Sequence, residues 1–464
     1  MTKRTTLLFL FLLSTNFIIG QNKTERLDSL MTEYYKSGAF NGNILVAENG
    51  EIIYQNSFGL ANEEANEKLN KNSVFYIASL TKAFTAMGIV LLEEKGKLEY
   101  NDEISKYLPE LQFYGGITIR NLLTHTSGLP DYMELFENNW NHKKIAVDED
   151  VVSELVRLKP KILFKPGEEF RYSNTGYTLL ATIIERISNQ SFGEFLKRNI
   201  FKPLKMNDTK VFMRYKSKEN PQNLTVGYMK DSLGKFFRPI TLDKYALAYY
   251  LGGVSGDGGI FSTTGDLLKW DRALYENELI SEEDKKIIFT SQKTNDGKNI
   301  HYGFGWFLTD INEVYGKIAF HSGGWNGYIT YIERHLERDK TIILLQNHST
   351  DKTTIPKKEI RKILYNQPIY HKTELDSSIL KLYAGTYLTD SGKENEIIYE
   401  KGKLFVPMNP KVKLELIPVS KTKFIMDGFS PEVTYEFFVD NGKVQKYRVQ
   451  QIGQNVDRTA NRIE

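Results

Sequence analysis

The periodicity of the apolar residues changes once along this 464-residue chain, and that change limits the folds open to it. Residues from about 25 to 365 alternate helical and strand patterns without repeats, which is typical of an α/β sheet protein. After residue 368 the chain gives short β-rich runs separated by glycine turns, a pattern that favours a small antiparallel barrel or meander. We therefore predict a large mixed domain and a small β-rich one, with the boundary near residue 372.

Turn residues and helical spacing locate the main elements of the larger domain. Asn49-Gly50 separates two apolar runs and predicts a β-hairpin, because both residues tolerate the positive φ of a tight turn. A second hairpin is predicted over residues 328–345. Apolar residues recur at helical spacing after Ser79 and again over residues 178–187. Strands thus flank a long helical middle, which predicts a sheet with a helical insertion.

The first twenty residues have the pattern of a secretory signal peptide. Lys3 and Arg4 precede an apolar run over residues 7–13, and the small residue Gly20 stands before Gln21. We expect cleavage there, leaving an exported protein, periplasmic or secreted, that is soluble and has no stable membrane span. An uncleaved N-terminal anchor is the alternative, although the apolar run is short for a membrane-spanning helix. The chain has no cysteine, so acylation as a lipoprotein is excluded.

Composition and missing motifs exclude several classes of function. The 61 basic residues nearly balance the 58 acidic ones, so the chain lacks the charge of a nucleic-acid-binding protein, and no nucleic-acid partner is expected. Phosphate-loop, dinucleotide-binding, zinc-protease and Gly-x-Ser-x-Gly motifs are absent. The seven histidines are scattered, with no carboxylate at ligand spacing, so we expect no metal and no organic cofactor.

Ser79-Leu80-Thr81-Lys82 opens the first clear helix. Positions i and i+3 share one helix face, so the Lys82 amine can reach the Ser79 hydroxyl. The positive end of the helix dipole suits an oxyanion that develops at the serine, and a buried lysine can relay a proton near neutral pH. The simpler alternative is that Ser79 caps the helix while Lys82 is a solvated charge.

Two further motifs follow along the chain. Tyr172-Ser173-Asn174 precedes the second helix, and its phenol and amide would lie on the same side of an extended segment. His321-Ser322-Gly323-Gly324 follows a strand-like run, and its glycines would let a substrate backbone approach closely. Taken singly, each motif also fits an ordinary turn beside a helix or strand.

Ser-x-x-Lys, Tyr-x-Asn and His-x-Gly in this order resemble the serine β-lactamase-like family, which includes class C β-lactamases, D-Ala-D-Ala carboxypeptidases, D-aminopeptidases and related esterases. The resemblance covers about residues 25–350 and includes segments at 122–130, 203–209, 258–267 and 302–306. It implies an α/β (α+β) fold, with an antiparallel sheet flanked by helices, an inserted helical domain and the active site in the cleft between them.

The resemblance also implies a division of the chain. The tail is similar to the antiparallel β-barrel-like domains that follow some family members. We therefore expect a signal peptide at 1–20, a β-lactamase-like serine hydrolase domain at 21–372 and a C-terminal β-rich domain at 373–464.

Carried over residue by residue, the resemblance gives three catalytic side chains. Ser79 would be the acylated nucleophile and Lys82 its proton partner. Tyr172 would be the general base that also protonates the leaving group. Whether Lys82 or Tyr172 takes the first proton stays open, since strongly coupled groups titrate as a pair.

Five further residues would bind the substrate. Asn174 would hold a substrate carbonyl, and His321, Ser322 and Gly323 would line the strand edge. The N–H group of Gly324, together with that of the nucleophile, would form the oxyanion hole. His125 and His301 lie in family-like segments, and we interpret both as structural.

His321 departs from the Lys-Thr-Gly pattern of the penicillin-recognising members. A lysine holds a carboxylate as a fixed positive charge, whereas an unperturbed histidine is mostly neutral at pH 7. The His-x-Gly variant looks like that of the family's esterases and D-aminopeptidases. Arg171, beside Tyr172, is a second candidate for a carboxylate anchor, with a solvated arginine as its alternative.

The sequence thus predicts an exported serine hydrolase that forms an acyl-enzyme on Ser79 with ester or amide substrates. Small molecules or peptides are the expected partners, D-amino-acid and peptidoglycan-derived peptides included. The rival within the same class is a β-lactamase or D-Ala-D-Ala carboxypeptidase. The rival from another class is a catalytically silent binding or sensing module.

Overall fold

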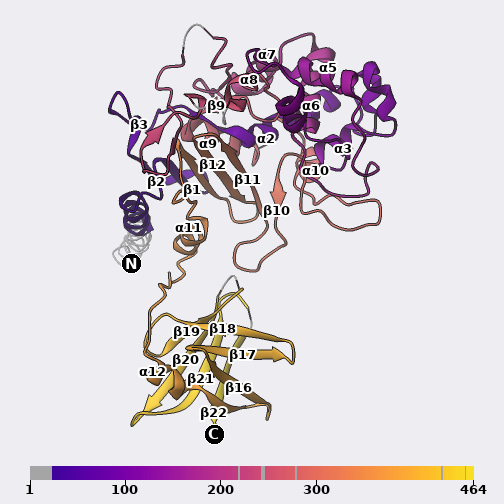
Figure 1. Cartoon of the computed structure of the whole chain (residues 1–464). Coiled ribbons are helices and arrows are strands. Elements are labelled where there is room, and N and C mark those ends of the chain that lie inside the picture. Colours follow the sequence, from indigo (N-terminus) through magenta and orange to yellow (C-terminus); the bar gives the residue numbers. More distant parts are fainter. Residues whose placement is uncertain (1–22, 218–219, 242–245, 277–278, 430–431, 455) are drawn as a thin grey trace, which may run out of the picture. The chain divides into compact units, whose positions relative to one another are not determined.

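The chain forms two compact units, each described here by itself. A computed structural model describes residues 23–464 apart from 218–219, 242–245, 277–278, 430–431 and 455 (Figure 1). The predicted signal peptide lies outside the described residues. The first unit runs to Ile360 without residues 312–314, and the second holds those three residues and 361–464. The boundary predicted near residue 372 falls in the irregular segment 367–376 and stays a prediction.

An antiparallel sheet of six strands is the main sheet of the first unit, as predicted (Figure 1). Its order is β10-β11-β12-β13-β1-β2. The predicted Asn49-Gly50 turn joins β1 to β2, and its two residues have the positive φ values, 50° and 79°, that this turn needs. The strands are β1 Gly42–Glu48, β2 Glu51–Phe58, β10 Phe307–Leu308, β11 Ile318–Trp325, β12 Tyr328–His335 and β13 Lys340–Gln346.

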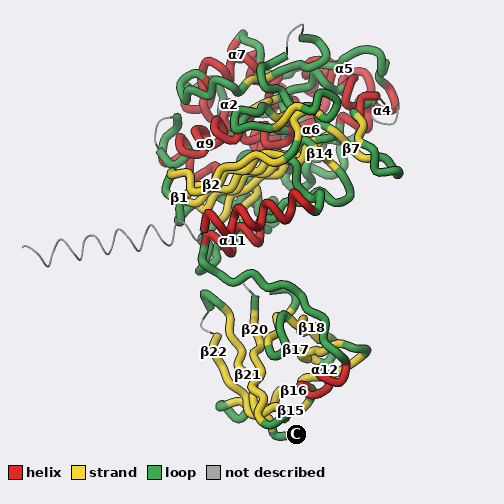
Figure 2. The backbone as a smooth tube through the Cα atoms, turned by 90° about the vertical axis from the view of Figure 1, so that its left-hand side faces the viewer, coloured by secondary structure: helices red, strands yellow, loops and turns green. Residues whose placement is uncertain are grey.

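Helices cover this sheet and build a helical region from the middle of the chain. α9 packs on β1 and β13 (Figure 2), and a helix over residues 23–36 lies against β2, where Tyr54 donates to Asp28. The helices of this region and its surroundings are α2 Thr81–Glu94, α3 Ile119–Leu123, α4 Tyr132–Asn139, α5 Asp148–Leu158, α6 Asn174–Ser188, α7 Phe192–Leu196, α8 Leu247–Tyr250, α9 Thr264–Ala273, α10 Glu282–Ile288 and α11 Lys357–Leu364.

The two helices predicted from apolar spacing form the centre of the core. All the apolar residues that predicted α2 are buried, and the chain leaves the helix at Gly96, whose φ is 61°. α6 packs against α2 and begins four residues before the predicted start, because the Ser173 hydroxyl accepts from the Gly176 N–H and caps the helix at Asn174. The cap places the Tyr-x-Asn motif at the start of a buried helix.

Short strands complete the first unit. They form three small sheets, whose members are β3 Leu60–Asn62 with β4 Glu67–Lys68, β5 Phe75–Tyr76 with β9 Ile260–Ser262 and β6 Lys210–Val211, and β7 Tyr228–Lys230 with β8 Phe236–Phe237 and β14 His348–Ser349.

The second unit is a closed barrel of eight strands, which confirms the predicted antiparallel barrel (Figure 2). The helix α12 Ser377–Tyr383 precedes the strands, and the barrel core is filled by buried aromatic rings, among them Tyr387, Phe424 and Phe437. The strands are β15 Gly385–Thr389, β16 Glu394–Glu400, β17 Lys403–Asn409, β18 Val412–Pro418, β19 Lys423–Met426, β20 Val433–Asp440, β21 Lys443–Gln451 and β22 Val456–Arg462. None of the helices in the described part of the chain is long and apolar enough to cross a membrane.

Candidate active site

Ser79 lies in a single 3-10 turn, Ala78–Leu80, that leads directly into α2. Ala78 has a φ of 50°, in the left-handed region that alanine seldom adopts, so the backbone before the serine is strained. β11 lies against this turn at Gly323, where an added Cβ would stand 2.4 Å from the Ile77 carbonyl oxygen and 3.1 Å from the Ala78 Cβ. Glycine therefore allows the strand to contact the turn that carries the serine.

Lys82 has no exposed surface and uses all its hydrogens inside the protein. Its Nζ donates to Ser79 Oγ at 3.2 Å, to Asn174 Oδ1 at 2.9 Å and to the backbone oxygen of Asp257 at 3.0 Å. Three acceptors match the three hydrogens of an ammonium group, so Lys82 acts here as a charged donor. The alternative of a solvated lysine is wrong.

Asn174 is the first residue of α6, and its amide bridges two charged groups. Its Oδ1 faces the ammonium of Lys82, while its Nδ2 donates to Asp131 Oδ2 at 3.0 Å. Asp131 also caps α4 by accepting from the Met133 N–H at 2.9 Å. The structure therefore brings Asn174 to Ser79 and Lys82, and adds a carboxylate that the motifs had not indicated.

Tyr172 lies beside the lysine and is half-buried. The Lys82 Nζ is 4.9 Å from the centroid of its ring, which also contacts the ring of His125 at a centroid distance of 4.3 Å. Within the described part of the chain the Tyr172 hydroxyl makes no hydrogen bond, so it is available to a ligand. The structure thus places Tyr172 next to Lys82 without a bond to Ser79.

His321 lies on β11 but faces the interior, and only 1% of its surface is exposed. Its Nδ1 donates to the Ser322 carbonyl at 2.7 Å, and its Nε2 is 3.4 Å from the Tyr302 hydroxyl. Burial, with a contribution from nearby Lys82, lowers the pKa of His321 to about 3. The His321 ring is therefore neutral and enclosed, with both its nitrogens engaged, and its predicted place among the substrate-binding residues stays a prediction.

The other three residues of this motif differ in exposure. Ser322 and Gly324 are exposed, whereas Gly323 is buried against the nucleophile turn. A Cβ built on Gly324 would meet no atom within 4 Å, so open space lies in front of this residue. β10 pairs with β11 at Phe320 and Ala319, and β11 has no described partner on that side beyond them. The free edge fits the predicted role of the Gly324 N–H as an oxyanion donor, which stays a prediction.

Asp257 is a buried group that the sequence motifs had not indicated. Its backbone oxygen accepts from Lys82, and its carboxylate accepts from the Tyr132 hydroxyl at 3.3 Å and 3.4 Å. Burial raises the pKa of the Asp257 carboxyl, and the charge of Lys82 opposes that shift. The nearest signal in the sequence was the family-like segment over residues 258–267, which begins one residue after Asp257.

His125 is fully buried beside the Tyr-x-Asn loop. Its Nδ1 accepts from the Ser173 N–H at 3.0 Å, and its backbone oxygen accepts from the Arg171 N–H at 2.9 Å. Burial first, and then the charge of Lys82, hold the pKa of His125 well below its usual range. The ring therefore supports the Tyr172 backbone as a neutral group.

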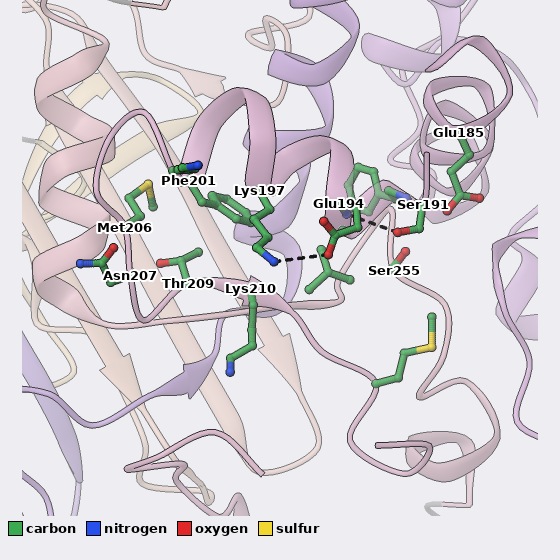
Figure 3. Close-up of a pocket in the computed structure, with 15 residues that line it drawn as sticks. Glu185, Ser191, Glu194, Lys197, Phe201, Met206, Asn207, Thr209, Lys210 and Ser255 are labelled. Carbon is green, nitrogen blue, oxygen red and sulfur yellow. Dashed lines mark hydrogen bonds and ion pairs between the residues drawn. The ribbon is translucent and has the colours of Figure 1, made fainter. Parts of the chain in front are cut away.

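Two other parts of the surface lie outside this cluster. Arg171 is exposed and forms no ion pair with a described residue, which favours its solvated alternative. A cavity of about 510 Å³ is lined by Phe192, Phe201, Lys197, Lys210 and Ser255, among other residues (Figure 3). None of the eight predicted site residues lines this cavity, so the cavity and the catalytic cluster are two different sites.

Comparisons with known proteins identify the family. A family model described as Beta-lactamase matches residues 27–365. Penicillin-binding protein 4* of Bacillus subtilis is 40% identical over 434 residues, which cover 91% of this chain and 96% of that protein.

Solved structures show the same fold at lower identity. The octameric penicillin-binding protein homologue from Pyrococcus abyssi has a TM-score of 0.63 and 24% identity, covering 94% of this chain and 99% of that one. The D-amino acid amidase from Ochrobactrum anthropi has a TM-score of 0.60 and 23% identity, covering 75% of this chain and 99% of that one. With a family match over residues 27–365 and a relative 40% identical along nearly its whole length, the chain belongs to the beta-lactamase family of serine hydrolases.

Proposed function

We propose that the protein is an exported hydrolase that forms an acyl-enzyme on Ser79 with ester or amide substrates, D-amino-acid peptides among them. The observation that carries this proposal is the 3.2 Å contact between Lys82 Nζ and Ser79 Oγ, made by a lysine with no exposed surface. Burying an ammonium group is costly unless nearby groups compensate its charge. Here the ammonium lies against the oxygen that gains negative charge during attack.

Acylation begins when Ser79 Oγ attacks the carbonyl carbon of the substrate. The serine proton passes to Tyr172, because Lys82 already donates its three hydrogens and has no lone pair free to accept it. In this proposal Tyr172 accepts the proton as a phenolate, with the Lys82 ammonium 4.9 Å from the centroid of its ring. Tyr172 then gives the proton to the leaving alcohol or amine as the tetrahedral intermediate collapses.

Deacylation reverses the roles of the same groups. A water molecule attacks the acyl carbon and loses its proton to Tyr172, which returns it to Ser79 Oγ when the acid is released. In both steps the N–H groups of Ser79 and Gly324 stabilise the oxyanion. Removing one donor of an oxyanion hole typically lowers kcat by about 10²- to 10³-fold.

Penicillin recognition is the second candidate, and a specific finding favours it. The relative that is 40% identical carries the name of a penicillin-binding protein, which points to β-lactamase or D-Ala-D-Ala carboxypeptidase chemistry. Against it, the strand position that holds a cation in penicillin-recognising members is occupied by the neutral, enclosed His321. The D-amino acid amidase fold supports amide substrates instead. We therefore rank ester and amide hydrolysis first.

The intact mass of the mature protein, measured after a fluorophosphonate probe and separately after a penicillin, tests both candidates. Ser79→Ala is the diagnostic variant. Ser153→Ala is its matched control, because Ser153 is an exposed serine on α5 whose hydroxyl makes no hydrogen bond to a described residue. We expect one phosphonate adduct on the wild type and on Ser153→Ala, and none on Ser79→Ala.

Each result has a definite consequence. A penicillin adduct that also needs Ser79 would move penicillin recognition to first place. If neither probe labels the wild type, the catalytic proposal falls and the silent binding module leads. The mass of the secreted protein also tests export, since cleavage before Gln21 predicts the loss of residues 1–20.

We also propose that residues 21–372 hold the complete hydrolase and that 373–464 form a separate domain. The support is that each unit has its own buried core. A chain ending at residue 372 should therefore keep fluorophosphonate labelling at the rate of the full chain. Loss of labelling in a truncated protein that still folds would assign the barrel a part in catalysis.

A further inference from the structure

A small cavity lies at the end of β11, beyond the predicted oxyanion position. Its volume is about 80 Å³, and the turn that joins β11 to β12 contributes Asn326 to its wall. Arg214 and Arg238 also line it, together with the ring of Tyr328. None of these four residues has a part in the acyl transfer described above.

Two buried donor atoms in the wall of the cavity lack acceptors among the described residues. Nε of Arg238 and Nδ2 of Asn326 are buried and have no hydrogen-bond partner in the described part of the chain. Arg214 donates to the Tyr328 hydroxyl at 3.1 Å and forms no ion pair with a described residue. Arg238 is paired with Glu64 through Nη2, so one of the two positive charges is compensated. Buried donors left without acceptors are costly, which points to a ligand that accepts from them.

Along the chain the cavity lies close to the predicted oxyanion donor. Asn326 follows Gly324 by two residues, or about 7 Å along an extended strand. The edge of β11 that would receive a substrate leads from Gly324 toward this turn. A ligand whose reacting carbonyl is held by the Gly324 N–H would therefore reach the cavity with its next four or five atoms.

Close backbone contacts at two glycines, Gly327 in the turn and Gly227 in a neighbouring segment, fix the position of the turn. Gly327 has a φ of 89°, and an added Cβ there would stand 2.5 Å from the carbonyl carbon of Gly227. A Cβ on Gly227 would in turn stand 2.4 Å from the Tyr328 ring. Because these segments touch through backbone atoms, Asn326 keeps a fixed position relative to Gly227, which also lines the cavity.

On the basis of the proposed function, we propose that this cavity binds a carboxylate carried by the acyl part of the substrate. Guanidinium and amide donors around a small volume suit a planar anion, and a space of about 80 Å³ holds a carboxylate group but not a ring. The anchor supplies the positive charge that His321 lacks, at the other end of the strand motif. The favoured acyl groups are glutaryl and adipoyl chains or the side chain of an acidic amino acid.

Two p-nitrophenyl esters test the assignment through hydrolysis. One carries an adipoyl chain with a free carboxylate, and the other carries the same chain as its neutral methyl ester. We expect the wild type to prefer the anionic ester in kcat/KM by at least about tenfold, as a hydrogen-bonded charge pair would give. Arg214→Gln should bring this preference close to one. Arg171→Gln removes an exposed arginine and should retain the preference.

Binding to a protein that cannot be acylated separates this inference from the proposed function. Calorimetric titration of Ser79→Ala with the monoanilide of adipic acid should give binding that Arg214→Gln, added to the same protein, weakens by at least about tenfold. If that loss occurs while the wild type hydrolyses neither ester, the hydrolase proposal falls and the anion site stands. Equal hydrolysis of both esters, or binding unchanged by Arg214→Gln, overturns the anion site. A preference abolished by Arg171→Gln would move the anchor beside Tyr172.

Discussion

Tyr302 presents its hydroxyl to Nε2 of His321 at 3.4 Å, deep inside the first unit. Nδ1 of the same ring donates to the Ser322 carbonyl, so the imidazole is neutral and carries its hydrogen on Nδ1. This pair explains why the third motif reads His-x-Gly without supplying a cation. The histidine is a structural part of β11, and the exposed surface of the motif comes from Ser322 and Gly324.

We predict that the first unit loses stability as His321 takes up a proton. The pKa of His321 is about 3 in the folded protein, against an ordinary value of 6.5, so the unfolded chain binds more protons between these limits. Stability therefore falls as the pH is lowered from about 7 toward 3, by about 2 kcal/mol at pH 5. Calorimetric unfolding at both pH values should show this loss in the wild type.

His321→Gln should remove that part of the pH dependence. His301→Gln replaces an exposed histidine and serves as the matched control, whose pH dependence should follow the wild type. If His321→Gln loses as much stability between pH 7 and pH 5 as the wild type does, the buried neutral histidine is not the cause of that loss.

The two glycines of the motif should differ sharply in their tolerance of a methyl group. Gly323→Ala would bring a Cβ within 2.4 Å of the Ile77 carbonyl oxygen and push β11 away from the nucleophile. We expect it to slow fluorophosphonate labelling by about 10²-fold and to cost about 1–3 kcal/mol of stability. Gly324→Ala adds its methyl group to open space, so its melting temperature should match the wild type. Equal effects of both changes would contradict the close contact at Gly323.

Lys82→Met should abolish the chemistry while sparing the fold. The change removes the ammonium that faces Ser79 Oγ, and general acid–base or electrostatic partners of this kind contribute about 10²- to 10⁴-fold. The measurement is the rate of phosphonate labelling, with circular dichroism as the check on folding. Lys285→Met is the matched control, because Lys285 is also buried but donates to Tyr275 and Glu282. A labelling rate that survives in Lys82→Met would remove Lys82 from the mechanism.

The local parts of this protein were predictable from the sequence for physical reasons. Ser79 and Lys82 meet because they are three positions apart where a 3-10 turn continues into α2, which places both side chains on one face. The hairpin follows from Asn49-Gly50 because only a few residue types tolerate the φ values of its turn. The barrel followed from regularly spaced turns. Boundaries were less predictable: α6 starts at Asn174, four residues before the predicted start, since the hydroxyl of Ser173 caps it.

Contacts between distant segments required the fold. Lys82 is hydrogen-bonded to Asn174, 92 residues away, and to the backbone of Asp257, 175 residues away. The resemblance had placed Asn174 in the same site, as a ligand of a substrate carbonyl. A backbone carbonyl such as that of Asp257, in contrast, leaves no mark in a side-chain motif. The burial of His321 likewise depends on rings from other segments, such as Tyr302 and Phe307, that pack around it.

Asp148 offers a test of how the Asp257 carbonyl is held in place. This buried carboxylate at the start of α5 accepts from the Ser255 N–H at 3.0 Å, from the Gly256 N–H at 3.2 Å and from the Ser255 hydroxyl. Burial raises the pKa of Asp148 to about 7 from an ordinary value of 3.8. The folded protein therefore binds more protons in this interval, and stability falls as the pH rises from about 4 to 7.

Asp148→Asn keeps hydrogen-bonding capacity at the loop but has no charge to bury. The stability of this variant relative to the wild type should therefore rise by up to about 4 kcal/mol from pH 4 to pH 8. Asp148→Ala leaves two N–H groups without an acceptor and should cost about 2–4 kcal/mol at pH 5. Because the next residue along the loop holds Lys82, the alanine variant should also label more slowly with the phosphonate, whereas the asparagine variant should not. Thermal unfolding at the three pH values and the labelling rates decide the matter: an alanine variant that labels at the wild-type rate would show that the loop keeps its position without the carboxylate.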